Sequence, residues 1–426
     1  MNIKVYPQQL KGTVEIAASK SVAHRMMICS ALSEKGGTIS AIMKGTDIEA
    51  TANCLAELGT DIQILENKAI VTPVYGEKRD ICKLYCKDSG STFRFMLPLV
   101  AALGCHAEFS GTERLASRPV SELREVLSAH GITFSADTLP FEISGKLESG
   151  IYEIDASISS QYVTGLLLAL PLLKGDSQII LKNRVVSSDY IKITLDVMKL
   201  FGVEVETTEN GFLIKGSAKY VSPETANCEG DWSSACFFAV AGGIGGGVSL
   251  ENISMDSLQG DKAILEFINE TGGSFARYIN RNGVDSYTFG SSANLKAGVF
   301  HTENTPDVVP ILAVLCSFCG GTSEIVGISR LKDKESDRLS ETIKMLDAFG
   351  ISAFTGENSL YVTGGSPVGG KYHVPDDHRM AMAAVIMATY ASGESEIYDI
   401  DCISKSYPHF LENFARLGGK FDVLGI

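Results

Sequence analysis

The pattern of apolar and polar residues along the chain repeats six times. In each repeat, a helix-like stretch ends in glycine and is followed by a short alternating strand, a turn and a second strand, as at 203–215 and 351–362. Glycine suits the end of a helix because it adopts the left-handed conformation without steric cost. The spacing exceeds the roughly 20 to 50 residues of a solenoid repeat. The six glycines lie 68 to 78 residues apart, at Gly59, Gly131, Gly202, Gly272, Gly350 and Gly418.

A second feature repeats with nearly the same period. A polar or small-residue stretch opens an apolar helix in each unit, as is typical of helix N-caps. Each unit is therefore predicted to contain a strand, a helix, a strand, a helix and a hairpin. Three such units could pack into one domain, so we expect two pseudo-threefold domains of α/β class with a boundary near 228–231. The helix openings lie 70 to 74 residues apart, at Lys20, Gly90, Gln161, Ser233, Asp307 and His378.

The composition argues against several classes of protein. The 426 residues include 37 Lys and Arg against 51 Asp and Glu, and a net charge of −14 does not suit a nucleic-acid-binding surface. The longest apolar runs, such as 163–173, are shorter than the roughly 20 residues of a membrane span, and the N-terminus lacks a signal-peptide pattern. Ten cysteines without the spacing of metal ligands predict reduced thiols, no metal site and a cytoplasmic location.

Positively charged residues gather near the helix openings although the chain is acidic. A helix N-terminus attracts anions through its free N–H groups and its dipole, so a cation there is unfavourable unless an anion pairs with it. One or two such cations would suit an ordinary solvated surface. Six of them predict a bound polyanion, and they are Lys20, Arg25, Arg118, Arg338, Arg379 and Lys405.

Each candidate for acid–base chemistry also has a structural interpretation. Asp307 opens a strongly apolar helix and could be a catalytic carboxylate or an N-cap. His378 could carry a proton or belong to a capping region. In the charged run 330–339, Lys334 and Arg338 share a helix face, which suits either a site or an exposed helix start with salt bridges.

Four motifs lie in order along the chain: Ala18-Ser-Lys-Ser-Val-Ala-His-Arg25, Asp88-Ser-Gly-Ser-Thr-Phe-Arg94, Lys332-Asp-Lys-Glu-Ser-Asp-Arg-Leu339 and Asp376-Asp-His-Arg-Met-Ala-Met382. Together they resemble the motifs of the 5-enolpyruvylshikimate-3-phosphate (EPSP) synthases. The resemblance implies two domains, each of three βαβαββ units around a pseudo-threefold axis, in the inside-out α/β barrel of the enolpyruvyl transferase fold. It implies a first domain of 1–18 and 230–426, a second of 19–229, and an active site in the cleft between them.

The resemblance also implies an activity. Members of this family transfer the enolpyruvyl group of phosphoenolpyruvate to the 5-hydroxyl of shikimate 3-phosphate and release phosphate, in chorismate and aromatic amino-acid biosynthesis. The family reaction needs no cofactor, and both substrates are anions, which agrees with the cations at the helix openings. We therefore expect these small molecules as partners, no nucleic-acid or membrane partner, and a monomer.

The matching motifs imply roles for individual residues. Asp307 resembles the carboxylate that takes the 5-hydroxyl proton, Glu335 resembles the group that moves protons at the methylene carbon, and Lys20 resembles a catalytic contact to both substrates. The residues expected to bind shikimate 3-phosphate are Lys20, Ser21, Arg25, Ser159, Ser160, Gln161, Ser187, Asp307 and Lys334. Those expected to bind phosphoenolpyruvate are Lys20, Gly90, Arg118, Gln161, Arg338, Arg379 and Lys405, with His378 and Tyr190 in supporting positions.

Three residues depart from the family pattern. Asp88, Phe95 and Arg330 stand where many members have Asn, Pro and Asn. In this family, glycine at the position of Gly90 leaves room for the phosphonate of glyphosate, which favours inhibition by that compound. Phe95 opposes this inference, because the loss of proline could shift the helix that carries Gly90.

Two alternative functions remain. UDP-N-acetylglucosamine enolpyruvyl transferases share the fold, but they have a reactive Cys or Asp where this chain has Glu113, and Lys-Asn where it has Lys20-Ser21. A non-catalytic scaffold of six units would need similar surfaces in every unit. The helix openings instead differ sharply from one another, which favours one composite, asymmetric site.

Overall fold

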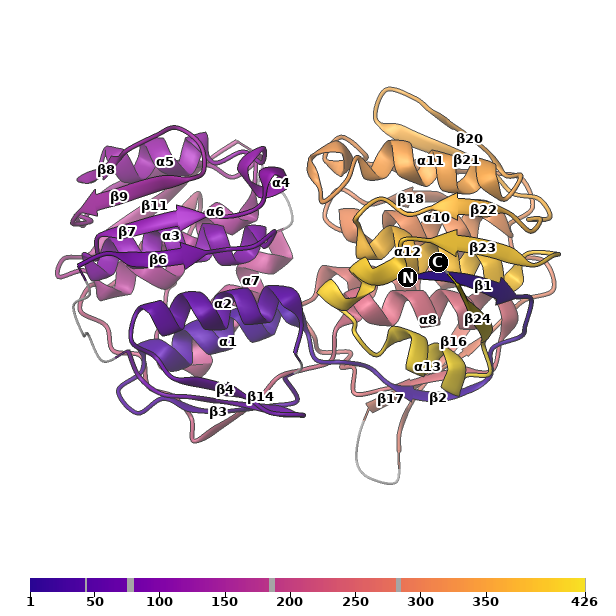
Figure 1. Ribbon diagram of the computed structural model, residues 1–426, viewed down its shortest axis with the longest axis horizontal. Coiled ribbons are helices and arrows are strands. Elements are labelled where there is room, and N and C mark those ends of the chain that lie inside the picture. Colours follow the sequence, from indigo (N-terminus) through magenta and orange to yellow (C-terminus); the bar gives the residue numbers. More distant parts are fainter. Residues whose placement is uncertain (43, 75–79, 184–187, 281–284, 426) are drawn as a thin grey trace. The chain divides into compact units, whose positions relative to one another are not determined.

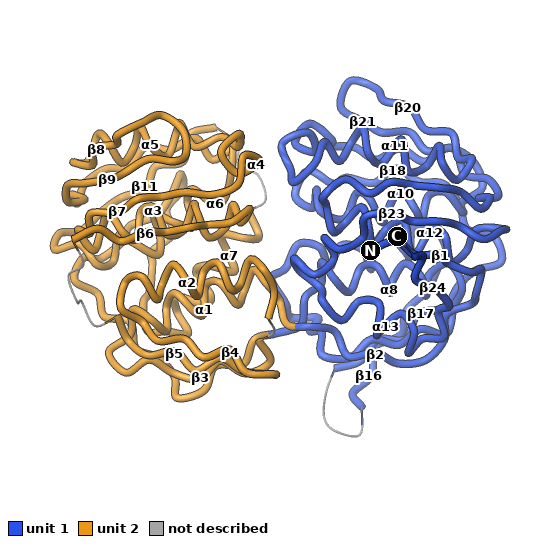
Figure 2. Tube along the Cα trace, viewed as in Figure 1, with its two compact units in different colours: residues 1–17, 229–426 blue, residues 18–228 orange. Residues whose placement is uncertain are grey.

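The computed structural model describes residues 1–42, 44–74, 80–183, 188–280 and 285–425 (Figure 1). The chain folds into two compact units (Figure 2). Residues 1–17 and 229–426 form unit 1, and residues 18–228 form unit 2. The chain therefore leaves unit 1 after its first strands, completes unit 2 and then returns.

Unit 2 contains three four-stranded sheets of one topology (Figure 1). In each sheet, two neighbouring strands are parallel, and the other two form an antiparallel hairpin. The hairpin strand that comes later in the sequence lies next to the parallel pair. A parallel pair needs a crossover segment and a hairpin needs only a turn, as the repeat predicts. In spatial order, the sheets are β14 (Thr225–Asn227), β3 (Gly37–Ser40), β5 (Lys68–Val71) and β4 (Ile62–Ile64); β6 (Cys82–Tyr85), β7 (Ala107–Ser110), β9 (Phe141–Gly145) and β8 (Ile132–Phe134); and β10 (Ile151–Asp155), β11 (Ser177–Lys182), β13 (Gly211–Ile214) and β12 (Glu206–Thr208).

Unit 1 repeats this topology, with two strands supplied by the N-terminal segment. The first sheet begins with β2, and the third includes β1 between β23 and β24. In spatial order, the sheets are β2 (Gly12–Glu15), β15 (Val248–Glu251), β17 (Asp285–Gly290) and β16 (Ser274–Ile279); β18 (Val299–His301), β19 (Thr322–Val326), β21 (Ser359–Thr363) and β20 (Ser352–Thr355); and β22 (Lys371–His373), β23 (Ser395–Tyr398), β1 (Asn2–Tyr6) and β24 (Lys420–Leu424).

Three buried helices form the centre of each unit. They are buried on almost every side, as expected of helices that are apolar all round. In unit 2 they are α1 (Lys20–Leu32), α3 (Gly90–Leu103) and α6 (Ser160–Ala169), and in unit 1 they are α8 (Trp232–Gly245), α10 (Val309–Ser317) and α12 (His378–Tyr390). The remaining helices are α2 (Thr46–Glu57), α4 (Glu113–Ala116), α5 (Ser121–Ser128), η1 (Leu170–Leu172), α7 (Ser188–Leu200), η2 (Gly260–Ala263), α9 (Ile264–Glu270), η3 (Pro306–Val308), η4 (Leu331–Asp333), α11 (Arg338–Ala348), η5 (Ile400–Lys405) and α13 (Phe410–Arg416).

The glycine pattern predicted the helix ends correctly. All six repeat glycines have φ between +73° and +94°, the region in which glycine carries no side-chain penalty. The hairpins predicted in 203–215 and 351–362 are β12–β13 and β20–β21. The α/β class with six similar units is thus confirmed. Within the described residues, every helix is too short or too polar to span a bilayer.

Candidate active site

The openings of the six central helices carry different chemistry in the two units. In unit 2 the N-cap residues are serines, which leave the positive end of the helix dipole without a compensating charge. In unit 1 the openings instead carry aspartates, two as the N-caps of α8 and α12 and one within η3 directly before α10, and their carboxylates oppose the dipole and can hold cations. The serines are Ser19, Ser89 and Ser159, and the aspartates are Asp231, Asp307 and Asp377.

Lys20 begins α1 and forms an ion pair with the second residue of α2. Its Nζ lies 2.8 Å from Oδ2 of Asp47, and both side chains are mostly buried. An anion that binds Lys20 therefore meets a cation already held in place by a neighbouring helix. The carbonyl of the next residue, Ser21, accepts a hydrogen bond from Arg25.

Arg25 is buried, and its donors are mostly occupied by the protein. Burial lowers its pKa to about 10. Its guanidinium donates four hydrogen bonds to other residues of the protein, which use four of its five N–H groups. These bonds connect α1 to α6 and α7 and leave Arg25 little capacity to bind a ligand. The acceptors are Ser21 O (2.6 Å), Thr194 Oγ1 (2.8 Å), Tyr190 O (3.1 Å) and Thr164 Oγ1 (3.2 Å).

Gln161, in the first turn of α6, is held between two residues of α3. Its Oε1 accepts a bond of 2.6 Å from Nη1 of Arg94, and its Nε2 donates one of 3.0 Å to Oγ of Ser91. Arg94 also donates to the carbonyl of Pro119, at 2.8 Å. The buried Arg94 thus fixes both a predicted ligand and the segment next to Arg118. Arg94 is part of a sequence motif, but the motif did not predict a role for it, because no local sequence pattern indicates that its side chain reaches α6.

The other predicted residues of unit 2 lie at the same helix ends. Ser159 caps α6 by accepting from the backbone N–H of Gln161, and Ser160 follows it; both are buried. Arg118 follows α4, and its guanidinium lies against Gly90 at the start of α3. Ser187 lies outside the described residues.

Asp307 is the centre of the charged cluster of unit 1. Its Oδ1 lies 2.6 Å from Nη1 of Arg338 and 3.2 Å from Nζ of Lys334, and its Oδ2 lies 3.1 Å from Nη2 of Arg379. Burial alone would raise the pKa of Asp307, but Arg379, Lys334 and Arg338 together hold that pKa well below its usual range. Burial lowers the pKa of Lys334, an effect that the charge of Asp307 opposes. The cluster is therefore a buried carboxylate inside a ring of cations.

Arg338 contacts three carboxylates, although only 1% of its side chain is exposed. Besides Asp307, its guanidinium bonds Glu335 at 2.5 Å and Asp377 at 2.7 Å through Nε. Asp377 also accepts from the backbone N–H of Arg379 at 3.0 Å, as the N-cap of α12. Asp377 thus orients two predicted ligands. The sequence could have indicated it as an N-cap, but not as the partner of Arg338, which lies 39 residues away.

A further buried carboxylate, Asp261, lies behind this cluster. It is 3% exposed, and its Oδ2 accepts a hydrogen bond from the hydroxyl of Ser233. Burial and the charge of Asp307 raise its pKa to about 6, against the opposing effect of Arg379. No local pattern indicated Asp261, because it lies in the short helix η2 without a distinctive motif.

Two predicted residues surround the start of α12. His378 is its first residue and is buried. Lys405, at the end of η5, donates to the carboxylate of Asp376 at 2.7 Å and to its carbonyl at 3.0 Å. The structure thus brings Asp307, Lys334, Glu335, Arg338 and Arg379 into direct contact, and attaches Lys405 to the loop before α12.

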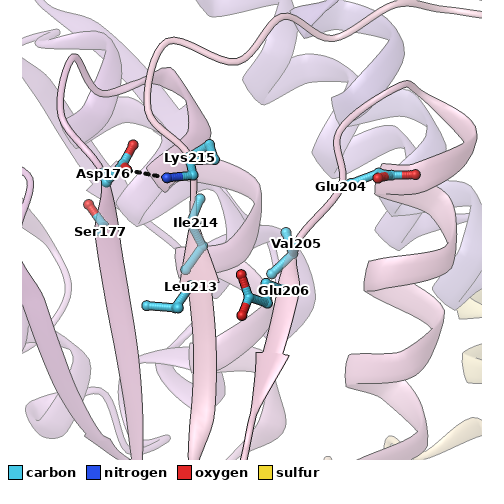
Figure 3. Close-up of a pocket in the computed structure, with 8 residues that line it drawn as sticks. All are labelled: Asp176, Ser177, Glu204, Val205, Glu206, Leu213, Ile214 and Lys215. Carbon is cyan, nitrogen blue, oxygen red and sulfur yellow. Dashed lines mark hydrogen bonds and ion pairs between the residues drawn. The ribbon is translucent and has the colours of Figure 1, made fainter.

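A hollow of about 270 Å³ in unit 2 has different chemistry (Figure 3). It is lined by β11, β12 and β13 and contains an ion pair of 2.7 Å between Asp176 and Lys215. Glu204 and Glu206 add negative charge. None of the predicted site residues lines it, and its acidic surface does not suit an anionic substrate.

Comparison with known proteins identifies closely similar chains. The family model for EPSP synthase (3-phosphoshikimate 1-carboxyvinyltransferase) matches residues 5–414. A 3-phosphoshikimate 1-carboxyvinyltransferase of Clostridium kluyveri is 37% identical over 428 residues, which cover 99% of this chain and 98% of that protein. The protein of the same name from Clostridium beijerinckii is 35% identical over 434 residues, with the same coverage.

Two solved structures share the fold. EPSP synthase from Acinetobacter baumannii superposes with a TM-score of 0.83 at 23% identity, over 100% of both chains. The enolpyruvyl transferase NikO from Streptomyces tendae has a TM-score of 0.79 at 15% identity, over 99% of this chain and 98% of that one. At these identities the likeness concerns the fold.

Proposed function

We propose that two clusters of side chains share the reaction of this chain, which belongs to the EPSP synthase family. The chain transfers the enolpyruvyl group of phosphoenolpyruvate to the 5-hydroxyl of shikimate 3-phosphate and releases phosphate, in the shikimate pathway. The residue roles that follow are our proposal. They rest on the matching motifs and on the contacts within each unit.

The contacts of Asp307 support its role as the base for the 5-hydroxyl proton. In the absence of substrate, three cations hold its pKa well below the usual range, so the group is ionised and can accept a hydrogen bond. When the carboxylate and phosphate of phosphoenolpyruvate pair with Arg338 and Arg379, those cations are shared with another anion. The pKa of Asp307 then rises toward the value that a proton acceptor needs.

Glu335 is positioned to move protons at the methylene carbon. Its carboxylate is partly exposed and bonds Arg338 at 2.5 Å, so one residue anchors both the substrate anion and the acid–base group. Addition protonates the methylene carbon, and elimination removes a proton from the resulting methyl group. A single carboxylate beside that carbon can serve both steps in turn. Lys334, Lys405 and His378 complete this set.

Unit 2 is suited to hold the phosphorylated acceptor. Its serine-capped helix openings combine free N–H groups with the charge of Lys20, and hydroxyls come from Ser21, Ser159 and Ser160. Gly90, Arg118 and Gln161 are proposed to contact phosphoenolpyruvate from this side, with Tyr190 behind Arg25. An active site in the cleft between two domains stays a prediction, as do the monomeric state and the cytoplasmic location.

The observation that carries these roles is the contact of Asp307 with Lys334, Arg338 and Arg379. The test is phosphate release from phosphoenolpyruvate and shikimate 3-phosphate by wild type and Asp307→Asn. The kcat of the variant should fall by a factor of about 10² to 10⁴. Calorimetry should show that the variant still binds shikimate 3-phosphate. Asp285→Asn is the matched control, because Asp285 pairs with Arg277 on an exposed hairpin, and it should stay near wild type. A near wild-type kcat for Asp307→Asn would reduce Asp307 to a structural role.

Acceptor specificity is tested with the same enzyme preparation. UDP-N-acetylglucosamine in place of shikimate 3-phosphate should give no phosphate release. Turnover with that sugar nucleotide would instead support the related enolpyruvyl transferase activity.

A further inference from the structure

A second, uncharged contact lies beneath the ion pair of Lys20 and Asp47. His24 is one turn beyond Lys20 on α1, and Thr51 is one turn beyond Asp47 on α2. Residues four apart lie above one another on a helix face. Nδ1 of His24 and Oγ1 of Thr51 are 2.7 Å apart, and both residues are fully buried. The same two helices are thus joined at two levels, by an outer charged pair and an inner neutral pair.

The inner contact continues into the first turn of α3. Oγ1 of Thr51 lies 2.7 Å from Oγ1 of Thr92, which donates to Oγ of Ser89 at 2.8 Å. Thr92 also approaches the carbonyl of Asp47 at 3.4 Å. Ser89 caps α3 and precedes Gly90. A buried line of polar groups, here called the threonine chain (His24, Thr51, Thr92 and Ser89), therefore links the second turns of α1 and α2 to the first turn of α3.

Hydrogen-bond counting fixes the direction of the threonine chain. Each hydroxyl has one proton, and that of Thr92 goes to Ser89. Oγ1 of Thr92 must then accept from Thr51, and Oγ1 of Thr51 must accept from an N–H at Nδ1 of His24. His24 is thereby assigned the neutral tautomer with its proton on Nδ1.

The surroundings of His24 agree with this tautomer. Among the residues that the structure describes, its Nε2 has no hydrogen-bond partner. An acceptor without a partner is tolerated better than a buried N–H in the same position. Burial, together with the charges of Lys20 and Arg25, lowers the pKa of His24 to about 3 against the opposing effect of Asp47. His24 is thus a neutral donor throughout the neutral pH range.

We propose that His24 is a positioning residue for phosphoenolpyruvate binding, which acts through Thr51 and Thr92 on the ends of α2 and α3. The proposal rests on the roles proposed above for Lys20 and Gly90. The bonds of 2.7 to 2.8 Å set how far α2 and α3 stand from α1. They thereby set where Asp47 holds Lys20 and where the backbone of Gly90 begins. An apolar contact could fill the same space, so stability alone does not require polar groups here.

The test compares two substitutions of His24 in the full-length enzyme. His24→Leu keeps the bulk of the side chain but removes the donor to Thr51. It should raise KM for phosphoenolpyruvate about five- to tenfold and change kcat by less than about threefold. His24→Asn places an amide N–H where Nδ1–H stood, and it should restore KM to within about twofold of wild type. If the substitutions acted only through a general loss of stability, His24→Leu and His24→Asn would not differ in KM for phosphoenolpyruvate.

Thr51→Val removes the hydroxyl at the middle of the threonine chain. Because His24 and Thr51 act through one set of bonds, the double variant with His24→Leu should raise KM no more than either single substitution. The control is Thr271→Val, which removes a buried hydroxyl that bonds the carbonyl of Ile268 at 2.8 Å in unit 1. It should lower Tm and leave KM unchanged.

Two further measurements separate the possible outcomes. If Lys20→Met leaves KM for phosphoenolpyruvate unchanged, the role proposed for Lys20 fails. If Lys20→Met raises KM but folded His24→Leu and Thr51→Val do not, the positioning role of His24 is overturned. Should both of these variants fail to fold, ¹⁵N NMR of the wild-type imidazoles decides the matter: a His24 ring that titrates near neutral pH, or one protonated on Nε2, contradicts the assigned chain.

Discussion

The guanidinium of Arg118 occupies the space that a side chain at Gly90 would need. A Cβ at position 90 would lie 2.6 Å from Nη1 and 2.8 Å from Cζ of Arg118. Contacts this short are not tolerated between such atoms, so Arg118 keeps its place only because residue 90 is glycine. Nε of Arg118 is buried without a hydrogen-bond partner among the described residues, which leaves packing to fix the guanidinium.

Gly90→Ala should therefore displace Arg118 and weaken anion binding. We expect KM for phosphoenolpyruvate to rise about three- to tenfold, because Arg118 is displaced from its ligand. The inhibition constant of glyphosate should rise by a larger factor, because the added methyl obstructs its phosphonate more than it obstructs the shorter substrate. Inhibition kinetics at varied phosphoenolpyruvate measure both. Gly365→Ala is the control, because its Cβ would meet only Ile351, at 3.6 Å. Unchanged constants in Gly90→Ala would contradict the steric argument.

Arg94→Met should release Gln161 and the segment at Pro119 together. The substitution keeps an unbranched apolar stem but removes the donors to Oε1 of Gln161 and to the carbonyl of Pro119. We expect KM for phosphoenolpyruvate to rise at least tenfold, because bonds from a charged donor typically contribute about 1.5 to 3 kcal/mol each. Tyr162→Phe, which removes only a hydroxyl bond to Pro119, should have a smaller effect in the same steady-state assay. Equal effects would show that Gln161 does not depend on Arg94.

Asp377→Asn should reduce both stability and catalysis. It removes a buried negative charge from Arg338, whose Nε donates to it at 2.7 Å, and weakens the cap of α12. Loss of one partner from a buried ion pair destabilises a protein by about 3 to 5 kcal/mol, and the other two carboxylates around Arg338 should reduce this figure. Urea unfolding measures it. Lys344→Gln, at an exposed pair with Glu341, should change stability by less than about 0.5 kcal/mol. A similar small change in Asp377→Asn would contradict the proposed anchoring of Arg338.

Asp261 should make the stability of the protein depend on pH. Its folded pKa of about 6 lies above its ordinary value of 3.8, so the folded state binds the proton more tightly than the unfolded state. This contribution to stability is fully present below the ordinary pKa and is lost as pH rises through the folded pKa. Asp261→Asn cannot ionise, so its stability relative to wild type should increase by about 1 to 3 kcal/mol between pH 4 and about pH 7. Urea midpoints across that range measure the difference, and a constant difference would contradict a raised pKa.

The local pattern determined much of the fold. Glycines at 68- to 78-residue spacing end helices in all six units, because the left-handed conformation at a helix end depends on the residue itself. The apolar stretches after Lys20, Gly90 and His378 form buried helices for a similarly local reason. Strand exchange could not be predicted in this way. β14, at the C-terminal end of unit 2, pairs with β3 near its N-terminal end, and β1 pairs with C-terminal strands of unit 1. Both pairings depend on packing between segments that are distant in the sequence.

For the candidate site, the sequence determined which residues to examine, and the tertiary structure decided which of them meet. The helix-opening pattern indicated Asp307 and a motif indicated Lys334 and Arg338, but the direct contacts among them join two separate segments that pack together. The sequence left open whether Asp307 was an isolated N-cap, and it gave no sign that Asp377 would share the guanidinium of Arg338. Residue type predicts the charge of a side chain, and residue spacing predicts the helix face on which it lies. Which charges share a buried volume depends on close packing over long sequence distances, and that volume then sets their pKa values.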